Sequence, residues 1–481
     1  MSLFGGIETA LSGLRAQQVQ TETATQNVAN ADNPNYSRQT VDLAPSPAYP
    51  APGFDAIGPG QIGTGVSVVD VRRITDSFTA TQLRSALSQQ GADSVEQDTT
   101  AQIEGIFNEL SSGSISDLLG QFWNAWQEVA NAPTDPGVRI NLVAKAQSLA
   151  TALQQSSTQL NDVRQNLDQQ IGVQVNTLNT LASQIANLNR QIVAVEATGQ
   201  NANDLRDQRD SLVNQIAGIA QVSVTEQANG SIRVALGGVG LVDGTTTTTL
   251  SLSPSGSGVS DVVAPGGTVI RPTSGSLAGL ERMRDQVIPD QLSALDDWAQ
   301  RLITAVNAVQ SGTDPTTGSP VANVYDLSTP GTPVQRPFFV GTSAATIAVN
   351  PAIVQNPNLI AASRTANGPG DGANALAIAA LQQDPTAGGL PPGGITIDGQ
   401  YQVFATAIGS AAATAKSNAA NQEILVNHLH QRQAQISGVS LDEEAAHLVN
   451  YQRAYEAAAR ALTTFDQMLD KLINDTGIVG R

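Results

Sequence analysis

Apolar residues recur every seventh position near one end of the chain, between Ser440 and Thr476. A second set of apolar residues lies three positions after members of the first. This alternating spacing of three and four is the seam of a helix that packs lengthwise along another helix. The first set is Leu441, Leu448, Tyr455, Leu462 and Leu469, and the second is Tyr451, Ala458, Phe465 and Leu472. The pattern therefore predicts a coiled-coil helix over this segment.

Ser440 and Glu443 indicate where this helix begins. The Ser440 hydroxyl can accept a hydrogen bond from the backbone N–H of Glu443, and the Glu443 carboxylate can reach back to Ser440, which together make a capping box. Gly438 interrupts the segment that precedes them. We therefore expect a break in the chain's helical structure just before Ser440.

The opposite end of the chain carries a weaker form of the same pattern. Phe4, Ile7, Leu11 and Leu14 keep the spacing of three and four, polar residues then interrupt it, and Val28 resumes it. A helix with so short a seam is marginal on its own. We expect the two end helices to contact each other and, in addition, copies of themselves in other subunits. The alternative is that two ordinary helices close a single globular core.

The apolar residues of both end helices are our candidates for an assembly interface. Such side chains are stabilised only when another surface removes them from water. The candidates are Phe4, Ile7, Leu11, Leu14, Val28, Leu441, Leu448, Tyr451, Tyr455, Leu462, Phe465, Leu469 and Leu472.

Long helical patterns fill much of the chain between its ends. Asp135 and Pro136 are a favourable helix start, and the heptad pattern after them predicts a rod about 90 Å long. We assign Phe122, Trp123 and Trp126 to the core, because large aromatic side chains are scarce in this chain. Helices are predicted over 76–110 with a break near Gly91 or Gly105, and over 115–130, 135–198, 204–217, 276–287, 290–309, 373–381 and 401–436, with Pro289 separating two of them.

Alternating apolar and polar residues predict short strands elsewhere. Asn229–Gly230 is the favoured turn of a tight hairpin between two of them. After the first helix, Pro34 presets a turn and Asn35 tolerates a positive φ. Strands are predicted over 40–43, 66–71, 222–225, 231–236, 245–252, 338–340 and 346–349.

Together these elements predict a mainly α fold with β-rich insertions. In this fold the terminal helices form a coiled coil, the long helices form a bundle layer, and a β-rich domain lies outside. The expected divisions are 1–35 and 437–481 for the terminal assembly layer, 36–221, 271–312 and 399–436 for the helical core layer, and 222–270 and 313–398 for the β-rich outer insertions. The layers are nested, because both halves of the chain must associate to complete the helical part.

Charge and composition limit the partners of the protein. With 24 basic and 42 acidic residues, the 481-residue chain has a net charge of −18. We therefore expect neither nucleic acid nor a membrane as a partner, because both attract basic surfaces. The absence of cysteine excludes disulfides and thiolate chemistry. No apolar run is long enough to span a membrane, and residues 1–13 lack the basic start of a cleavable secretory signal.

The residue types that most often perform chemistry do not form a recognisable site. His428 and His430 lie two positions apart on a predicted helix, so they point about 200° apart and cannot bind one metal together. His447 is an ordinary surface neighbour of Glu443. Gly370–Ala375 has the letters of a dinucleotide fingerprint, but no strand precedes it, so we interpret it as a loop that opens a short helix. We expect no catalytic, cofactor or metal site.

Three stretches of the sequence resemble the axial proteins of the bacterial flagellum. The first is Ser2–Ala16, at the start of the predicted N-terminal helix. The second is Asn27–Gln39, which ends in the tetrad Tyr36–Gln39. The third is Asn450–Tyr455, within the predicted C-terminal helix.

The tetrad Tyr36–Gln39 and two further stretches resemble, more narrowly, the hook-associated protein 1 family of hook–filament junction proteins. The two further stretches are Leu205–Leu212, where the chain returns from the long helix, and the helix pair between Gly279 and Ala308. The resemblance covers nearly the whole chain and is weakest over 222–270 and 313–335. Asn35 is a departure, because this family usually has glycine after the proline.

The resemblance implies a structural subunit, not an enzyme, in a short helical tier between hook and filament. Its implied partners are copies of itself, the hook protein, and the next hook-associated protein towards the filament. It also implies an extracellular location in the flagellum, export through the flagellar type III apparatus without a cleavable signal peptide, and an export chaperone on the C-terminal helix.

Two other functions stay open from the sequence. One is another flagellar axial subunit, either a flagellin or a neighbouring hook-associated protein. The other is an exported enzyme, such as a cell-wall hydrolase that uses carboxylates in the region 313–398.

Overall fold

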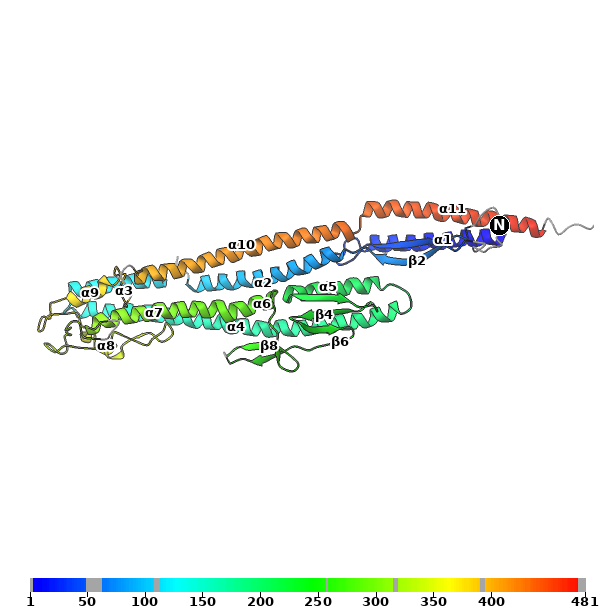
Figure 1. Cartoon of the computed structure of the whole chain (residues 1–481). Helices are drawn as coiled ribbons and strands as arrows, with labels where there is room; N and C mark the ends of the chain where they lie inside the picture. Colours follow the sequence, from blue (N-terminus) through cyan, green and yellow to red (C-terminus); the bar gives the residue numbers. More distant parts are fainter. Residues whose placement is uncertain are drawn as a thin grey trace, which may run out of the picture.

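The computed structural model describes residues 3–48, 63–107, 113–256, 258–314, 319–389 and 394–474. They form an elongated molecule with two paired helices at one end and a broader helical body at the other (Figure 1). The mainly α fold with β-rich insertions is confirmed. Predicted element ends such as 110 and 476 lie outside the described residues.

One long helix is the spine of the body. This helix, α4 (Pro136–Glu196), spans nearly the predicted range, and the Asp135 side chain caps it by accepting from the backbone N–H of Gly137 at 2.7 Å. Its heptad residues face inward, and the fully buried ones include Leu153, Leu160, Ile171, Leu178, Ile185 and Ile192. The helices packed around it are α3 (Ile115–Asn131), α5 (Asn203–Ile219), α6 (Ser276–Arg282) and α7 (Ile288–Ser311).

Aromatic side chains anchor the end of the body that lies far from the paired helices. Phe122, Trp123 and Trp126 are buried there, as predicted, and the rings of Phe338 and Phe339 pack against this cluster. The short elements in this region are the antiparallel pair β10 (Phe339–Val340) and β11 (Ala348–Val349), with α8 (Pro351–Gln355) and α9 (Ala373–Ala380).

Two small antiparallel sheets form the β-rich segment between α5 and α6. The first hairpin turns at Asn229–Gly230, as predicted, with Gly230 at a φ of 83°. The buried Arg209 donates to the Gly230 carbonyl at 2.7 Å and so ties this turn to the helices. The first sheet comprises β3 (Val222–Glu226), β4 (Ile232–Leu236), β5 (Val239–Asp243) and β6 (Thr246–Thr247), and the second comprises β7 (Ser251–Pro254), β8 (Ser260–Ala264) and β9 (Thr268–Val269).

The sequence pattern missed part of these sheets. It did not predict β5, β8 or β9, and it merged β6 and β7 into one strand over 245–252. β5 contains a glycine, and β8 carries adjacent buried residues, Val262 and Val263, so neither strand shows a clean alternation. A strand that other elements cover on both faces has no alternation of buried apolar and exposed polar residues, so its sequence does not show the pattern that predicts a strand.

The predicted break in the second helix is wrong. α2 (Ser77–Phe107) continues through both Gly91 and Gly105. Gly91 has a packing role instead, because a Cβ atom there would lie 2.1 Å from the carbonyl oxygen of Gly218 on α5. The glycine therefore allows two backbones to approach closely, and it does not end the helix.

Pro289 does not separate two helices as predicted. The chain stays helical from Ser276 to Ser311, with a π-helical turn, Met283–Val287, just before the proline. There the backbone N–H of Ile288 donates to the carbonyl of Met283, five residues back. The wider turn accommodates a residue that lacks an N–H and would clash in a regular helix.

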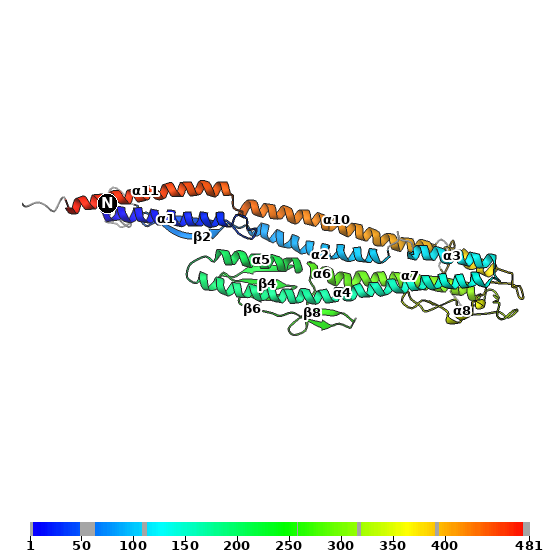
Figure 2. The ribbon, with the colours of Figure 1, turned by 180° about the vertical axis from the view of Figure 1, so that it is seen from behind.

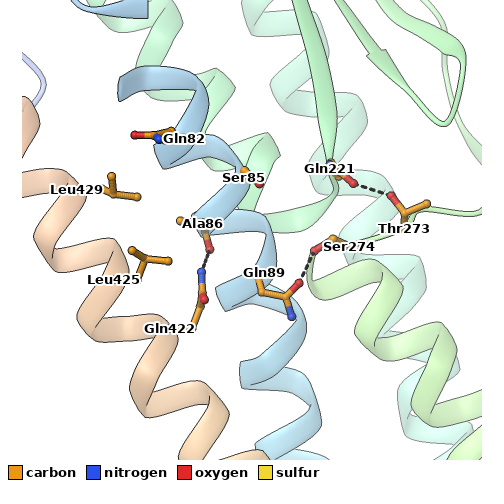
Figure 3. Close-up of a pocket in the computed structure, with 10 residues that line it drawn as sticks. All are labelled: Gln82, Ser85, Ala86, Gln89, Gln221, Thr273, Ser274, Gln422, Leu425 and Leu429. Atoms are coloured by element: carbon orange, nitrogen blue, oxygen red, sulfur yellow. Dashed lines mark hydrogen bonds between the residues drawn. The ribbon is translucent and has the colours of Figure 1, made fainter. Parts of the chain in front are cut away.

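A two-helix arm connects the body to the paired helices. α10 (Ile397–Ser437) begins four residues before its predicted start and packs on α2 through a small cluster containing Leu83, Ala86, Val426 and Leu429. Figure 3 shows this contact beside a cavity of about 580 Å³, in which the Gln422 amide donates to the Ala86 carbonyl at 2.9 Å.

Among the described residues, no helix has the length and apolar character needed to cross a bilayer.

Candidate assembly interface

The two end helices lie side by side and antiparallel. α1 (Leu3–Ala29) and α11 (Leu441–Asn474) extend together beyond the body, and Figure 2 shows the same pairing from behind. A Cβ atom on Gly6, near the start of α1, would lie 2.6 Å from the ring of Phe465, late in α11. Arg38, just beyond α1, pairs with Glu443, early in α11, at 2.8 Å. The predicted contact between the two ends is confirmed.

Small residues, more than the predicted stripe, are buried on α1. The helix lies between α11 and a hairpin of β1 (Gln39–Pro45) and β2 (Val66–Arg73), and Ala10, Ala16 and Ala24 are buried there. The predicted apolar stripe, which is the set of α1 candidate residues, lies at the side of this buried face. Its members Ile7, Leu11 and Leu14 are half-buried, and Phe4 and Val28 are exposed.

Within one chain, the apolar seam of α11 is only partly covered. Of the α11 residues, Leu441–Asn474, only Glu444 is buried. The predicted positions Leu448, Tyr451, Leu462, Phe465 and Leu469 are half-buried, and Leu441, Tyr455 and Leu472 are exposed. Phe4 is 68% exposed and Leu441 54% exposed. A single chain therefore leaves large apolar side chains in water at this end, which is a feature of surfaces that bind other proteins.

Half of the predicted capping box forms at the start of α11. Ser440 Oγ accepts from the backbone N–H of Glu443 at 3.4 Å, as predicted. The Glu443 carboxylate does not serve the reciprocal half, because it accepts from Arg38 Nη1 at 2.8 Å. Glu443 thus links the start of α11 to the segment that follows α1.

The segment after α1 folds into a turn that Asn27 holds. The Asn27 amide donates to the Gln39 carbonyl at 2.9 Å, and its oxygen accepts from the Tyr36 hydroxyl at 2.9 Å and the Gln39 N–H at 2.9 Å. Asn35 tolerates a positive φ but does not adopt one, since Asn367 is the only described non-glycine residue with a positive φ. The turn closes without it, because proline at the second position also fits a type I turn, in which both central residues have a negative φ.

Two motifs that are distant in sequence meet beside this turn. Asp207, in the Leu205–Leu212 stretch of α5, accepts from the backbone N–H and the hydroxyl of Ser37, each at 2.8 Å. It also pairs with Arg73, at the end of β2, at 2.7 Å. Asp207 and Arg73 had no predicted role, because nothing in the spacing of the two motifs indicates a contact between Ser37 and Asp207 across 170 residues.

Burial and neighbouring charges shift the pKa of two groups at the junction where the turn after α1 and the end of β2 meet α5. Burial, together with Asp204, Asp207 and Glu444, raises the pKa of the Tyr36 hydroxyl well above its usual range, so Tyr36 stays protonated and can donate to Asn27. Burial acts to lower the pKa of Arg73, but Asp210 and Asp207 more than offset it and raise that pKa. The junction therefore contains a firmly charged guanidinium between two carboxylates.

The candidate chemical groups lie apart from one another. His428 and His430 are exposed on α10, and the ring of His447 lies 5.7 Å from that of Tyr451. Across the described residues, no three His, Cys, Asp or Glu side chains gather as a metal site. As expected, Gly370–Ala375 is a loop that opens a short helix, α9.

The carboxylate Asp371 in this loop has a structural role. Burial would raise its pKa, but hydrogen bonds from the backbone N–H groups of Ala373 and Arg364, and from Thr365 and Ser363, hold that pKa down at about 2. A hydrolase's acid group needs the opposite shift, towards neutral pH.

Comparisons with known proteins agree along the whole chain. Three family models match: the flagellar hook-associated protein FlgK helical domain over 100–323, the flagella basal body rod protein over 7–36, and the flagellar basal body rod FlgEFG protein C-terminal over 431–475. The flagellar hook-associated protein 1 of Bacillus subtilis (strain 168) is 30% identical over 519 residues, covering 100% of each chain. This chain belongs to the flagellar hook-associated protein 1 family.

Other members of the family are more distant but equally complete. Those of Salmonella typhimurium and Escherichia coli (strain K12) are 28% and 27% identical, and the alignments cover 97% of this chain and 99% of theirs. The solved structure of the flagellar hook junction protein FlgK from Burkholderia pseudomallei is 21% identical, with a TM-score of 0.60, covering 74% of this chain and 100% of that chain. The fold is therefore shared with that structure.

The family match places this chain among the structural, axial components of the flagellum. Its relatives are flagellar structural proteins, which are not enzymes. These relatives are hook-associated proteins, which favours a hook-associated protein over a flagellin as the type of axial subunit. The rod-protein and C-terminal models coincide with α1 and its following turn, and with α11 and the end of α10. The elements that carry the candidate interface thus have counterparts in other flagellar axial proteins.

Proposed function

We propose that this protein joins the hook to the filament by packing the α1–α11 pairs of many copies into a tube. The observation that supports this is the partial cover of both apolar stripes within one chain. Neighbouring copies supply the missing cover when they pack against the 13 candidate residues that run from Phe4 to Leu472. Because each copy offers different surfaces to its two neighbours, head-to-tail contacts generate a helical tier and not a closed dimer.

The other layers of the molecule have separate tasks in this proposal. The terminal layer, 1–35 and 437–481, lines the inside of the tier. The helical layer, 36–221, 271–312 and 399–436, sets the spacing between copies, and the β-rich insertions, 222–270 and 313–398, face outward. The partners are the hook protein on one side and the next hook-associated protein on the other.

A subunit between hook and filament must first leave the cell. We propose that it passes through the flagellar type III apparatus without a cleavable signal peptide and assembles outside the cell. A chaperone that covers α11 before export would keep its apolar seam from aggregating, because exposed apolar seams associate. The protein performs no catalysis in this scheme.

Deleting the gene and complementing it with variants tests the proposal. Cells without the protein should carry hooks without filaments and lose flagellin to the medium. Leu462→Asp should fail to restore filaments, because a charge in the seam cannot be buried unpaired. Gln467→Asp, an exposed position on another side of α11, should restore them. Filaments restored by Leu462→Asp, with the variant present at normal levels, would refute the seam.

A further inference from the structure

The junction between the paired end helices and the body has few covalent connections. In the described chain, residues 74–76 link β2 to α2, and residues 438–440 link α10 to α11. Cavities of about 630 Å³ and 650 Å³ flank the turn that contains Tyr36. Specific side-chain contacts across the junction therefore bear on the angle between the end helices and the body.

Buried polar contacts cross this loosely packed junction. Asp207 belongs to α5 in the body, and its side chain is only 6% exposed. All three of its donors belong to the turn and the β1–β2 hairpin that follow α1 and pack beside it: the N–H and hydroxyl of Ser37 at 2.8 Å each, and Arg73 Nη1 at 2.7 Å. Charge-assisted hydrogen bonds of this kind are short and directional, so they fix an orientation as well as a distance.

A second carboxylate extends the contact. Asp210, one turn along α5 from Asp207, accepts from Arg73 at 2.7 Å and lies 3.6 Å from Arg84 on α2. Arg73 therefore bridges two carboxylates on one face of α5. In addition, the backbone N–H of Arg38 donates to the Ser437 carbonyl, at the end of α10, at 2.7 Å.

We propose that Asp207 is a positioning residue that fixes the direction in which the α1–α11 pair leaves the body. This inference rests on the proposed function, because the direction matters only if the pair must meet its neighbours. α11 has 34 residues. Such a helix is about 50 Å long, so a tilt of about 10° at the junction moves its far end by about 9 Å, close to one helix diameter. An error of that size would misplace every seam contact at the far end.

Distance measurements on the full-length monomer test the proposal directly. The native chain has no cysteine, so Ala194→Cys on α4 and Ala457→Cys on α11, both at exposed positions, accept one spin label each. Double electron–electron resonance then reports the distribution of distances between body and end helices. We expect a narrow distribution in this background. Asp207→Ala should widen it about twofold, because the variant removes the three hydrogen bonds that Ser37 and Arg73 donate to this carboxylate.

Matched variants separate positioning from general damage. Arg72→Gln removes an exposed ion pair with Asp42 in the same hairpin and should leave the distribution unchanged. Ser37→Ala removes only the hydroxyl contact and should widen the distribution less than Asp207→Ala does. The melting temperature of the body should match the wild type in both. If Asp207→Ala does not fold, Ser37→Ala decides the question.

An unchanged width and centre in Asp207→Ala, or in Ser37→Ala where it must decide, would overturn the positioning role. The outcome is separable from that of the proposed function. Leu462→Asp should abolish assembly while keeping the monomer's distance distribution narrow. If Asp207→Ala widens the distribution but Leu462→Asp assembles normally, the positioning role stands and the seam fails.

Discussion

Gly6 and Phe465 are in such close contact that the ring of Phe465 lies where a side chain on Gly6 would be. A Cβ atom on Gly6 would approach two ring atoms to 2.6 Å. The absence of a side chain lets the phenyl ring rest on the backbone of α1 and sets the distance between the end helices. Gly13, two turns further along α1, has no atom within 4 Å of the corresponding position. The two glycines of one helix therefore have different tasks.

Gly6→Ala should loosen the α1–α11 pair. The added methyl group forces the ring of Phe465 to move, and such overpacking costs about 1 kcal/mol. We expect amide hydrogens in the middle of α1 to exchange about fivefold faster. Gly13→Ala is the control and should leave exchange equal or slower, because alanine favours helix where space is open. Faster exchange in both variants would mean that the Phe465 contact is not the cause.

Hydrogen exchange in the wild-type monomer should divide the molecule into two parts. We expect faster exchange through α1 and α11 than through the body, by brief local opening of a pair that is otherwise helical and in place, because few of their side chains are buried. Most heptad residues of α4 are buried, so exchange there should be slowest. Mass spectrometry after brief labelling gives both measurements. Strong protection of α1 and α11 in a monomer would contradict the idea that they need neighbouring copies.

Gly91→Ala should destabilise the body. Its new methyl group would meet the Gly218 carbonyl, 2.1 Å from the ideal Cβ position, and backbone cannot move aside as a side chain can. We expect a loss of about 1–3 kcal/mol in the free energy of unfolding. Gly105→Ala, in the same helix but with open space around it, should be neutral or slightly stabilising. Urea unfolding followed by circular dichroism compares the two, and equal losses would contradict the close crossing of α2 and α5.

Glu281 should make stability depend on pH. Burial raises the pKa of this carboxyl group to about 7, although Arg284 acts to lower it. The folded state therefore binds the proton more tightly than the unfolded state. The stability from this group is fully present below pH 4.5 and is lost as the pH rises to about 7, by up to about 3 kcal/mol.

Glu281→Gln should remove that dependence. The free energy of unfolding of the wild type should fall relative to the variant between pH 4.5 and 8, and the difference should level off above pH 8. Glu104→Gln, at an exposed position of α2, is the control and should follow the wild type. Parallel curves for wild type and Glu281→Gln would show that the carboxyl group stays ionised throughout.

Several elements were predictable because their signals are local. Asp135 and Pro136 start α4 through a cap that involves adjacent residues, and Asn229–Gly230 supplies its own turn geometry. The heptad columns of α4 and α11 likewise repeat within a single helix. Errors arose where a residue type has more than one use: Gly91 permits a close crossing, and Pro289 follows a π-helical turn.

The sequence by itself determined that this protein is mainly helical and that both of its ends carry apolar residues at the spacing of a helix seam. Heptad spacing, helix caps and turns depend on residues close together in the chain, so the sequence alone predicts them. Tertiary structure alone decided that α1 turns its small residues, such as Ala10, towards its neighbours within the chain. It also decided that Asp207 would meet Ser37 and Arg73 at the junction. Those contacts join residues far apart in sequence, and they depend on where the folded helices bring their side chains.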